Sequence, residues 1–577
     1  VSLVGAEVVE NDRTSVTIML TIHQRAQLQY WASTPGGDGQ AVVLDNLPGS
    51  FHDMSYLPVI GKVNLTVIEF ADIVPPEITS VVIDIGTGVT VITFDEHVKA
   101  SSLNMTQLII AQSAGALSEH AYRLGNMALL SPDGNVINFQ MTEQDRVAAF
   151  YMSSDYDNFS QILHVETGAV VDLGLVAIQN RDGINVSEIP DRFEPLLQNA
   201  TIDYNTGVLT FIFNETVDVT PQPIVNLSGI RIVDKTGLSG GLAGATVYQT
   251  DAVTISILLT EQQRVTAIQT GLKQITAESL QRDQDEDYGN RFVGPGGDSD
   301  ANILDFYQGA IRDISKNEAT EHLNFYLREI PDHTPPVVTL VQLFFGTGKV
   351  VFSFSETIDM TPPSDFFIKG EGVDLIQFNA LSFALFVPLD VATVEAADAT
   401  NITMVVPEAR RVQLIKGSGT PGGHGTPVFF SGSRGAFFDM AHNFNPSMSG
   451  VTVLEYPDDV SPTLDSAVLD LNVGILRIIA SEPMRVTFLN TTQFILTNDN
   501  STSFEITGSE ILQRSEERTT NITLPESLRA NLVQYTATPG GDGVPLTLDV
   551  LENGMQDMGL NPNIAALNLS MVEIRDR

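Results

Sequence analysis

Acidic side chains recur in register along this chain of 577 residues. Three markers repeat: a Glu-x-x-Asp pair near a proline, a Glu that ends an alternating apolar segment, and an Asp followed by Met, Leu or Ile. Successive copies of each marker are 119, 141 and 126 residues apart. Clustered carboxylates repel one another unless something neutralises them, and Ca²⁺ takes about six to eight oxygen ligands of this kind. If the fold gathers the markers, the chemistry they could perform is cation binding.

Residue combinations that would indicate catalysis are missing from the sequence. The chain has no cysteine, which excludes disulfides, thiolate metal sites and thiol nucleophiles. Its nine histidines form no His-Glu-x-x-His motif, and the glycine-rich stretch 417–423 lacks the lysine pattern of a phosphate-binding loop. Carboxylate pairs are common in any acidic chain and are weak evidence for glycosidase chemistry. The sequence therefore predicts that this protein is not an enzyme.

The overall composition restricts the partners of the chain. A formal net charge of −41, from 71 acidic and 30 basic residues, argues against nucleic acid and against an anionic membrane surface. A hydrophobic content of 43% with 18% charged residues excludes general disorder. No apolar run approaches the length of about 18 residues that a membrane span needs.

The repeated markers divide the chain into units. Proline-containing segments separate the units, since proline favours extended linkers. The unit with the longest spacing is expected to carry an acidic loop insertion near residues 283–287. The predicted domains are 74–192, 193–333, 334–459 and 460–577.

Residues 1–73 match only the second part of a unit. Thr-Pro-Gly-Gly-Asp-Gly at 34–39 corresponds to the same six residues at 538–543, and roughly the first 40 residues of the unit are missing. The chain also begins Val1-Ser2-Leu3, without Met, as expected for a processed product or an internal piece. A sandwich that lacks strands exposes sheet edges and apolar core. Two interpretations are open: the sequence is cut from a longer repetitive polypeptide, or another subunit donates the missing strands.

Each unit is predicted to be an all-β sandwich. Short segments alternate apolar and polar residues, as Val350, Phe352 and Phe354 do, and Pro-Gly-Gly recurs at 35, 295, 421 and 539 in turns. Many short strands in units of about 120 residues are typical of tandem β-sandwiches. Thr or Pro followed by Glu suits the start of a short helix. Such helices are expected at 142–147, 260–265 and 407–412.

Two short motifs carry a family resemblance. Phe-Ser-Glu-Thr-Ile-Asp at 354–359 and Asp-Met-Ala-His-Asn at 439–443 resemble the bacterial (SbsA-type) Ig-like repeats of surface-layer and adhesin proteins. Related repeats resemble parts of very large surface proteins of microalgae. The resemblance covers all five units and implies Ig-like Greek-key sandwiches in an elongated array. It also implies a spacer or adhesive module without catalysis.

An Ig-like topology would bring the acidic markers together. The strand-end Glu and the Asp-Met turn would lie at the N-terminal pole of each domain, beside the Glu-x-x-Asp of the preceding joint. Each joint could then bind Ca²⁺ and stiffen the array into a rod. Alternatively, the Asp caps a turn, and the Glu residues are solvated or paired with arginines such as Arg312. The expected Ca²⁺ ligands are Glu69, Asp72, Glu96 and Asp172; Glu188, Asp191, Glu215 and Asp313; Glu329, Asp332, Glu356 and Asp439; and Glu455, Asp458, Glu482 and Asp557.

Asn-x-Ser/Thr sequons are more frequent than chance predicts. Twelve occur, against about five expected from the Ser and Thr content. Either a Thr-rich β protein makes them by accident, or the chain is a secreted glycoprotein with N-linked glycans on strand faces and loops. The second reading is favoured, because several sequons occupy equivalent positions in different units. The sequons are at Asn64, Asn104, Asn158, Asn185, Asn199, Asn214, Asn226, Asn401, Asn490, Asn500, Asn521 and Asn568.

The sequence therefore favours an extracellular or cell-surface structural glycoprotein. In this reading the chain is a repeating subunit of a fibre or filament, such as a surface fibril or flagellar hair. Its partner would be a second copy, which contacts the open unit at residues 1–73 and completes it. The alternative is the stalk of a cell-surface adhesin whose ligand-binding domain lies elsewhere. A carbohydrate-active enzyme with sandwich accessories is the weakest of the three hypotheses.

Overall fold

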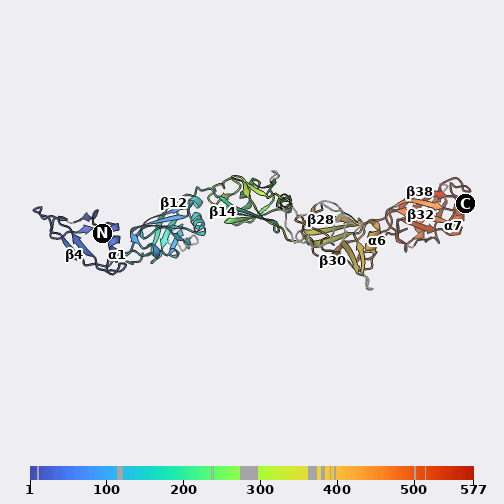
Figure 1. Cartoon of the computed structure of the whole chain (residues 1–577). Coiled ribbons are helices and arrows are strands. Elements are labelled where there is room, and N and C mark those ends of the chain that lie inside the picture. Colours follow the sequence, from blue (N-terminus) through green and yellow to red (C-terminus); the bar gives the residue numbers. More distant parts are fainter. Residues whose placement is uncertain are drawn as a thin grey trace.

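The chain folds into an elongated row of units that follow the order of the sequence (Figure 1). Units 1 to 5 denote the predicted ranges 1–73, 74–192, 193–333, 334–459 and 460–577. The computed structural model describes the chain except residues 10–11, 113–120, 126, 235–236, 238, 273–296, 361–372, 379–383, 390–391, 395–397, 499–501 and 514. Only the backbone is described at 239, 373–378 and 384–388. The expected acidic insertion near 283–287 lies outside the described residues.

Unit 2 is a sandwich of two sheets that share their last strand. β12 (Arg181–Ile189) pairs antiparallel with β11 along its first half and parallel with β5 along its second half. One sheet has the order β9-β10-β6-β5-β12 and the other β8-β7-β11-β12. The remaining elements are β5 (Ile78–Asp84), β6 (Val89–Val98), β7 (Leu108–Ala111), β8 (Ala121–Arg123), β9 (Ala128–Leu129), β10 (Gly134–Gln140), α2 (Glu143–Tyr151), α3 (Ser154–Asp157) and β11 (Ile162–Val165).

Units 4 and 5 repeat this strand order. Unit 4 contains β23 (Val338–Phe344), β24 (Lys349–Ile358), β25 (Val373–Phe378), β26 (Ala384–Pro388), β27 (Thr393–Val394), β28 (Ala399–Val405), α6 (Glu408–Lys416), β29 (Val428–Gly432) and β30 (Met448–Tyr456). Unit 5 contains β31 (Leu464–Asp470), β32 (Ile475–Ala480), β33 (Phe494–Asn498), β34 (Thr502–Glu505), β35 (Glu510–Ile511), β36 (Thr519–Thr523), α7 (Glu526–Val533), β37 (Thr547–Val550) and β38 (Ala566–Ile574).

Unit 3 differs in its last strand, which is interrupted at Leu327. The two parts, β21 and β22, pair separately, so the two sheets are not continuous. Its elements are β13 (Leu197–Asp203), β14 (Val208–Asp218), β15 (Ile230–Val233), β16 (Ser239–Gly241), β17 (Thr246–Val247), β18 (Ala252–Leu258), α4 (Glu261–Thr270), β19 (Ile303–Phe306), β20 (Arg312–Asp313), β21 (His322–Tyr326) and β22 (Arg328–Ile330).

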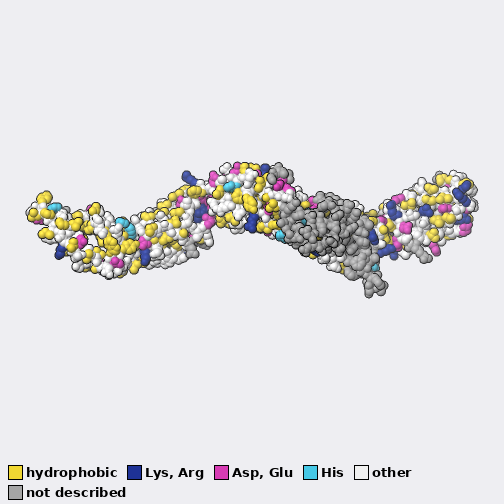
Figure 2. Space-filling view, viewed as in Figure 1, with side chains coloured by type: hydrophobic (Ala, Val, Ile, Leu, Met, Phe, Trp, Pro, Cys, Tyr) yellow, Lys and Arg dark blue, Asp and Glu magenta, His cyan; other side chains and the backbone are white. Residues whose placement is uncertain are grey.

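Unit 1 has only the second half of this architecture. It contains β1 (Glu7–Val8), β2 (Ile18–Met19), α1 (Ile22–Trp31), β3 (Val43–Asn46) and β4 (Lys62–Thr66), which form two separate two-stranded sheets. Apolar side chains whose counterparts in the other units are buried are exposed here, as at Leu44 (44%) and Met54 (78%). Figure 2 shows apolar atoms gathered at this end of the molecule.

The cores of the complete units follow the alternation read from the sequence. In β24, Val350, Phe352 and Phe354 are buried, and the residues between them are not. The equivalent face of β14 buries Leu209, Phe211 and Phe213. The prediction of an all-β chain of sandwiches is therefore confirmed. Among the described residues, the structure has no helix of sufficient length and apolar character to cross a membrane.

One helix stands at the same place in every unit, between two strands of different sheets. Thr21, Thr142 and Thr260 cap the first three by accepting a hydrogen bond from a backbone N–H three residues later. Pro407 and Pro525 precede the last two. The helices predicted at 142–147, 260–265 and 407–412 are present and extend beyond the predicted ends. Each helix carries an arginine at the same position, and in the first four units this arginine faces the next unit, as described below.

Candidate functional site

Three carboxylates meet at each of the four joints between units. They are the Asp of the Glu-x-x-Asp pair, the strand Glu, and the Asp of the Asp-Met turn. One oxygen from each lies within 4.8 Å of the others. The clusters are Asp72, Glu96 and Asp172; Asp191, Glu215 and Asp313; Asp332, Glu356 and Asp439; and Asp458, Glu482 and Asp557. Twelve of the sixteen predicted ligands are thus gathered at the joints.

The first Glu of each Glu-x-x-Asp pair does not join its cluster. The prediction of four carboxylates per joint is therefore wrong for this Glu, and three carboxylates meet instead. Side chains three residues apart on an extended chain point to opposite sides. The Glu therefore faces its own unit and accepts backbone N–H bonds from the loops after the helix. Glu188 binds Ser154 N (2.9 Å) and Gln161 N (2.7 Å). The equivalent bonds link Glu69 to Ser33 and Val42, Glu329 to Leu272 and Asn302, and Glu455 to Gly419 and Val428.

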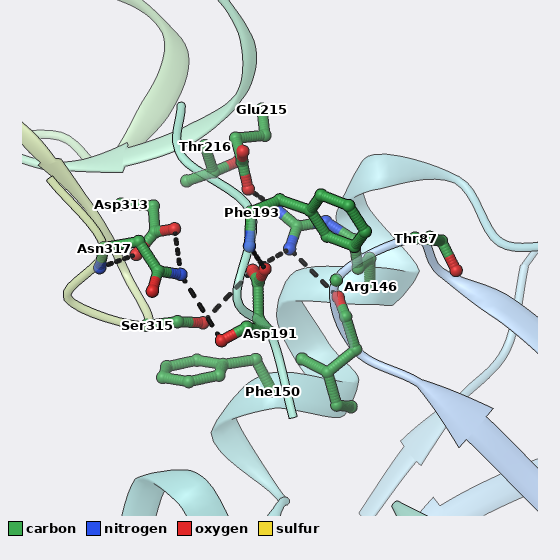
Figure 3. Close-up of polar contacts among 12 residues, drawn as sticks. Thr87, Arg146, Phe150, Asp191, Phe193, Glu215, Thr216, Asp313, Ser315 and Asn317 are labelled. Carbon is green, nitrogen blue, oxygen red and sulfur yellow. Dashed lines mark hydrogen bonds and ion pairs between the residues drawn. The ribbon is translucent and has the colours of Figure 1, made fainter. Parts of the chain in front are cut away.

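A helix arginine closes each joint. In Figure 3, Arg146 of α2 points between Asp191 of the linker and Glu215 of unit 3. Its Nη1 lies 3.1 Å from Asp191 Oδ2, and its Nη2 lies 3.3 Å from Glu215 Oε2. It also donates to Glu143 one helical turn earlier (2.7 Å). One guanidinium thus ties the helix and linker of one unit to the first sheet of the next.

The next two joints repeat this arrangement with shorter contacts. Arg264 lies 2.8 Å from Asp332 and 3.0 Å from Glu356. Arg411 lies 2.6 Å from both Asp458 and Glu482. The alternative in which the Glu residues pair with arginines therefore holds at these joints, although the arginines are those of the helices. Arg312, which the sequence suggested, pairs instead with Asp218 at 3.5 Å.

An asparagine satisfies the turn Asp in three of the joints. Asp313 accepts from both the backbone N–H and the side-chain amide of Asn317, each at 2.8 Å. The same amide donates to the backbone carbonyl of Asp191 (3.4 Å). Asn443 and Asn561 make the equivalent bonds to Asp439 and Asp557. The amide therefore links the Asp-Met turn of one unit to the linker that precedes it.

The residue after the turn Asp is apolar and inserts into the preceding unit. Ile314, Met440 and Met558 are buried, and each belongs to the hydrophobic core of the preceding unit. The second position of the Pro-Gly-Gly turn lies against the same segment. A Cβ on Gly36 or Gly422 would stand 1.8 Å from Leu173 O or 1.9 Å from Met558 O, respectively. At the first and fourth joints this contact leaves no room for a Cβ, so the position requires glycine there.

Burial favours the protonated form of the strand Glu residues. Burial and the neighbouring carboxylates, opposed by the helix arginine, together raise the pKa of Glu215 and Glu356 to about 8. The pKa values of Glu96 and Glu482 rise to about 7 for the same leading reason. Burial also raises the pKa of Asp439 to about 7. At neutral pH a joint without a bound cation is therefore stabilised by its arginine and by protonation.

The joints are numbered 1 to 4 from the N-terminus, so joint 1 connects units 1 and 2. Joint 1 lacks the turn asparagine and the buried arginine of the other three. Residue 176, four after the turn Asp, is Val rather than Asn, so no amide reaches Asp172 from that position. Asp172 is 1% exposed, and its Oδ2 has no hydrogen-bond partner. Its arginine, Arg25, has a side chain that is 46% exposed, against 4 to 6% in the next three joints. Within the described residues, Arg25 pairs with Glu96 and with neither Asp of the cluster.

The sequon asparagines lie at accessible positions. Nine are exposed: Asn64, Asn104, Asn158, Asn185, Asn199, Asn214, Asn226, Asn401 and Asn568. Asn490 and Asn521 are partly buried, and Asn500 lies outside the described residues. Asn214 also has a backbone role, since its Oδ1 accepts from Leu196 N (2.6 Å). Exposure is necessary for a glycan but does not show that one is attached.

Sequence reasoning missed the role of the helix arginines, and it used the turn asparagine only as part of the Asp-Met-Ala-His-Asn motif at 439–443. Their register was visible: each arginine lies four residues after the Thr or Pro that precedes its helix, and each asparagine lies four residues after its Asp. The arginines are Arg25, Arg146, Arg264, Arg411 and Arg529, and the asparagines are Asn317, Asn443 and Asn561. A search limited to acidic residues passed over the recurrence of both sets.

Comparison with known proteins gives only distant likenesses. No protein-family model and no curated protein matches the sequence. Among solved structures, domains 1–6 of the surface-layer protein SbsC are 10% identical over 87% of this chain, with a TM-score of 0.15. The S-layer protein rSbsC(31–844) is 11% identical over 87% of the chain, also with a TM-score of 0.15. The chain spans about half the length of each (55% and 54%). Likenesses this weak carry no inference about what the chain does.

Proposed function

We propose that this chain is a non-enzymatic, extracellular structural glycoprotein and the repeating subunit of a cell-surface fibre. The observation that supports this proposal is the structure of the joints. Gathered carboxylates, a helix arginine and a buried apolar residue recur between successive units. A joint that shares a hydrophobic core and an ion-pair network resists bending far more than a flexible linker does. The design suits a load-bearing rod.

The end of unit 5 that carries Arg529 and Gly540, here called the C-terminal pole, has features that favour end-to-end assembly. Arg529 of α7 pairs with Asp576 (2.8 Å) and Glu526 (2.7 Å), as the helix arginines of the internal joints do. No unit lies against it in the described chain, and a Cβ on Gly540 would meet nothing closer than Val533 at 3.9 Å. Unit 1 carries its own Asp-Met turn, and Met54, the counterpart of the buried Met440 and Met558, is 78% exposed. A second copy could therefore dock its residues 1–73 on this pole and make a further joint.

Electron microscopy of the purified chain in negative stain tests this proposal. Regular polymers are expected, with a repeat set by the length of one chain. Arg529→Ala should reduce them to short rods, whereas Arg518→Ala, at an exposed arginine of the same unit, should leave them intact. Isolated rods at every protein concentration would contradict a self-assembling fibre.

The stalk of a cell-surface adhesin is the second candidate. The same joints favour it, because a stalk also has to hold its tip away from the cell. It predicts straight single rods without polymers in the same images, so one experiment separates the two functions.

A further inference from the structure

We propose that joint 1 binds one hard divalent cation, with Ca²⁺ as the best fit, between Asp72, Glu96 and Asp172. At joints 2 to 4, a helix arginine and an asparagine amide offset the repulsion among the three carboxylates. The proposal concerns one joint of the unassembled chain, so it stands or falls separately from the fibre.

The unpartnered oxygen of Asp172 is the first argument. Its Oδ1 accepts from Val176 N (2.8 Å), while Oδ2 is buried and has no hydrogen-bond partner. A buried charged oxygen without a partner is strongly destabilising unless a cation or a proton satisfies it. In the other joints an asparagine amide occupies this position. Val176 offers no polar group, so the position is open to another electropositive partner.

The oxygen geometry is the second argument. Three carboxylate oxygens lie within 4.8 Å of one another, as expected for ligands that share one ion at about 2.3–2.6 Å. At joints 2 to 4 the asparagine amide also contacts the carbonyl of the linker Asp. The counterpart of that carbonyl in joint 1 is the carbonyl of Asp72, which would add a fourth oxygen. Water can complete the shell of about six to eight ligands.

Access is the third argument. A small pocket at this joint is lined by Arg25, Asp72, Glu96 and Gly174, among others, and has room for a water-sized particle. Because the Arg25 side chain is half-exposed, it can move aside without leaving a buried site. The guanidinium of Arg264 in joint 3 is 6% exposed and holds two cluster carboxylates. There the arginine fills the place that a cation would take.

The balance of charge agrees with a divalent ion. When all three carboxylates are ionised, as ligands of a cation are, they face one guanidinium and leave an excess of two negative charges. Ca²⁺ fits better than Mg²⁺, since carboxylates on two units cannot readily reach the strict octahedron that Mg²⁺ demands.

Binding to the full chain can be measured with Ca²⁺ alone and with Tb³⁺. Isothermal titration is expected to show one Ca²⁺ per chain, with a Kd on the order of 10⁻⁴–10⁻³ M, as in other extracellular modules. The only tryptophan, Trp31, ends α1, about 9 Å along the helix from Arg25. Light absorbed by Trp31 should therefore excite Tb³⁺ bound at joint 1, and Trp31→Phe should remove that signal.

Matched variants identify the site. Asp172→Asn should weaken Ca²⁺ binding tenfold or more, and Val176→Asn, which installs the amide of the other joints, should weaken it as well. Asp313→Asn at joint 2 and Glu69→Gln, whose carboxylate faces its own unit, should bind Ca²⁺ like the wild type. Asp172→Asn removes a repelling charge, so its unfolding midpoint without Ca²⁺ should equal or exceed that of the wild type, which shows that it folds.

Three results would overturn the proposal. One is the absence of Ca²⁺ binding to the wild type at millimolar concentration. Another is unchanged binding in both Asp172→Asn and Val176→Asn while the chain stays folded. The third is loss of binding in Asp313→Asn, which would move the site to joint 2. Mg²⁺ that competes equally with Ca²⁺ would overturn the assignment of Ca²⁺ as the best fit.

Discussion

Gly422 of unit 4 lies so close to Met558 of unit 5 that a Cβ would stand 1.9 Å from the Met558 carbonyl oxygen. The glycine belongs to the Pro-Gly-Gly turn, and the methionine follows the turn Asp of the next unit. At Gly422, as at Gly36, the glycine is therefore a contact between units as well as a turn residue.

Gly422→Ala should change the angle or the stiffness of this joint. Gly425 is the matched control, because it has nearly the same φ (+88° against +89°) and nothing within 4 Å of a Cβ. Each alanine should cost about 1–2 kcal/mol of stability through its positive φ. Small-angle scattering should show an altered or more flexible rod for Gly422→Ala alone. Equal scattering curves for the two variants would contradict this role.

Met440→Ala should uncouple units 3 and 4. Met440 is buried in the core of unit 3, and truncating a buried methionine costs about 2–5 kcal/mol. Urea unfolding should become less cooperative, with the transitions of the two units drawing apart. Met54 occupies the equivalent position in unit 1 and is 78% exposed, so Met54→Ala should leave the curve unchanged.

Arg411→Ala should destabilise joint 4 by about 3–5 kcal/mol, because it leaves Asp458 and Glu482 buried without their counter-ion. Arg410→Ala is the control on the same helix, since among the described residues the Arg410 side chain bonds only to Gln413 (3.3 Å) and to no carboxylate of a cluster. Differential scanning calorimetry measures both. A similar loss in the two variants would mean that the joint network contributes little.

Joint 3 should weaken as pH rises when no divalent cation is present. Burial, helped by Asp439 and Asp332 and opposed by Arg264, raises the pKa of Glu356 from 4.5 to about 8. The folded joint therefore holds a proton that the unfolded chain releases near pH 4.5. This contribution is complete below pH 4.5 and is lost as pH rises through about 8.

Glu356→Gln should flatten this dependence, because the amide stays neutral. Glu261 does not mask the effect. Burial tends to raise its pKa, but its interactions with Arg264 and Thr357 together lower it, so its own contribution is lost only as the pH falls below 4.5. Unfolding midpoints between pH 5 and pH 9 in the presence of a chelator provide the measurement. Parallel curves for wild type and variant would rule out Glu356 as the titrating group.

The exposed sequons should carry glycans when the chain is made in a secretory eukaryotic host. Peptide mass spectrometry after enzymatic deglycosylation should find modified asparagine at exposed sites such as Asn64 and Asn401, and less at the partly buried Asn490 and Asn521. Unmodified asparagine at all of these sites would show that the sequons arise by accident in a Thr-rich chain.

Much of the architecture could be predicted because its causes are local. Alternation in segments such as 350–354 requires a strand with one buried face, and Thr142 or Pro407 before a Glu starts a helix. The register of the acidic markers showed that something recurs at the joints. Alternation also placed Glu356 on the same face as Phe352 and Phe354, which explains its burial.

The sequence by itself thus determined the class of fold, the repetition and the sign of the charge at each joint. Only the tertiary structure decided which carboxylates meet, because the parallel pairing of β12 with β5 sets the linker Asp191 beside Glu215 and Asp313 and turns Glu188 away. It also decided what neutralises them. Partner choice in a buried cluster depends on distances of a few ångströms between residues that are far apart in the sequence, and spacing along the chain does not contain those distances.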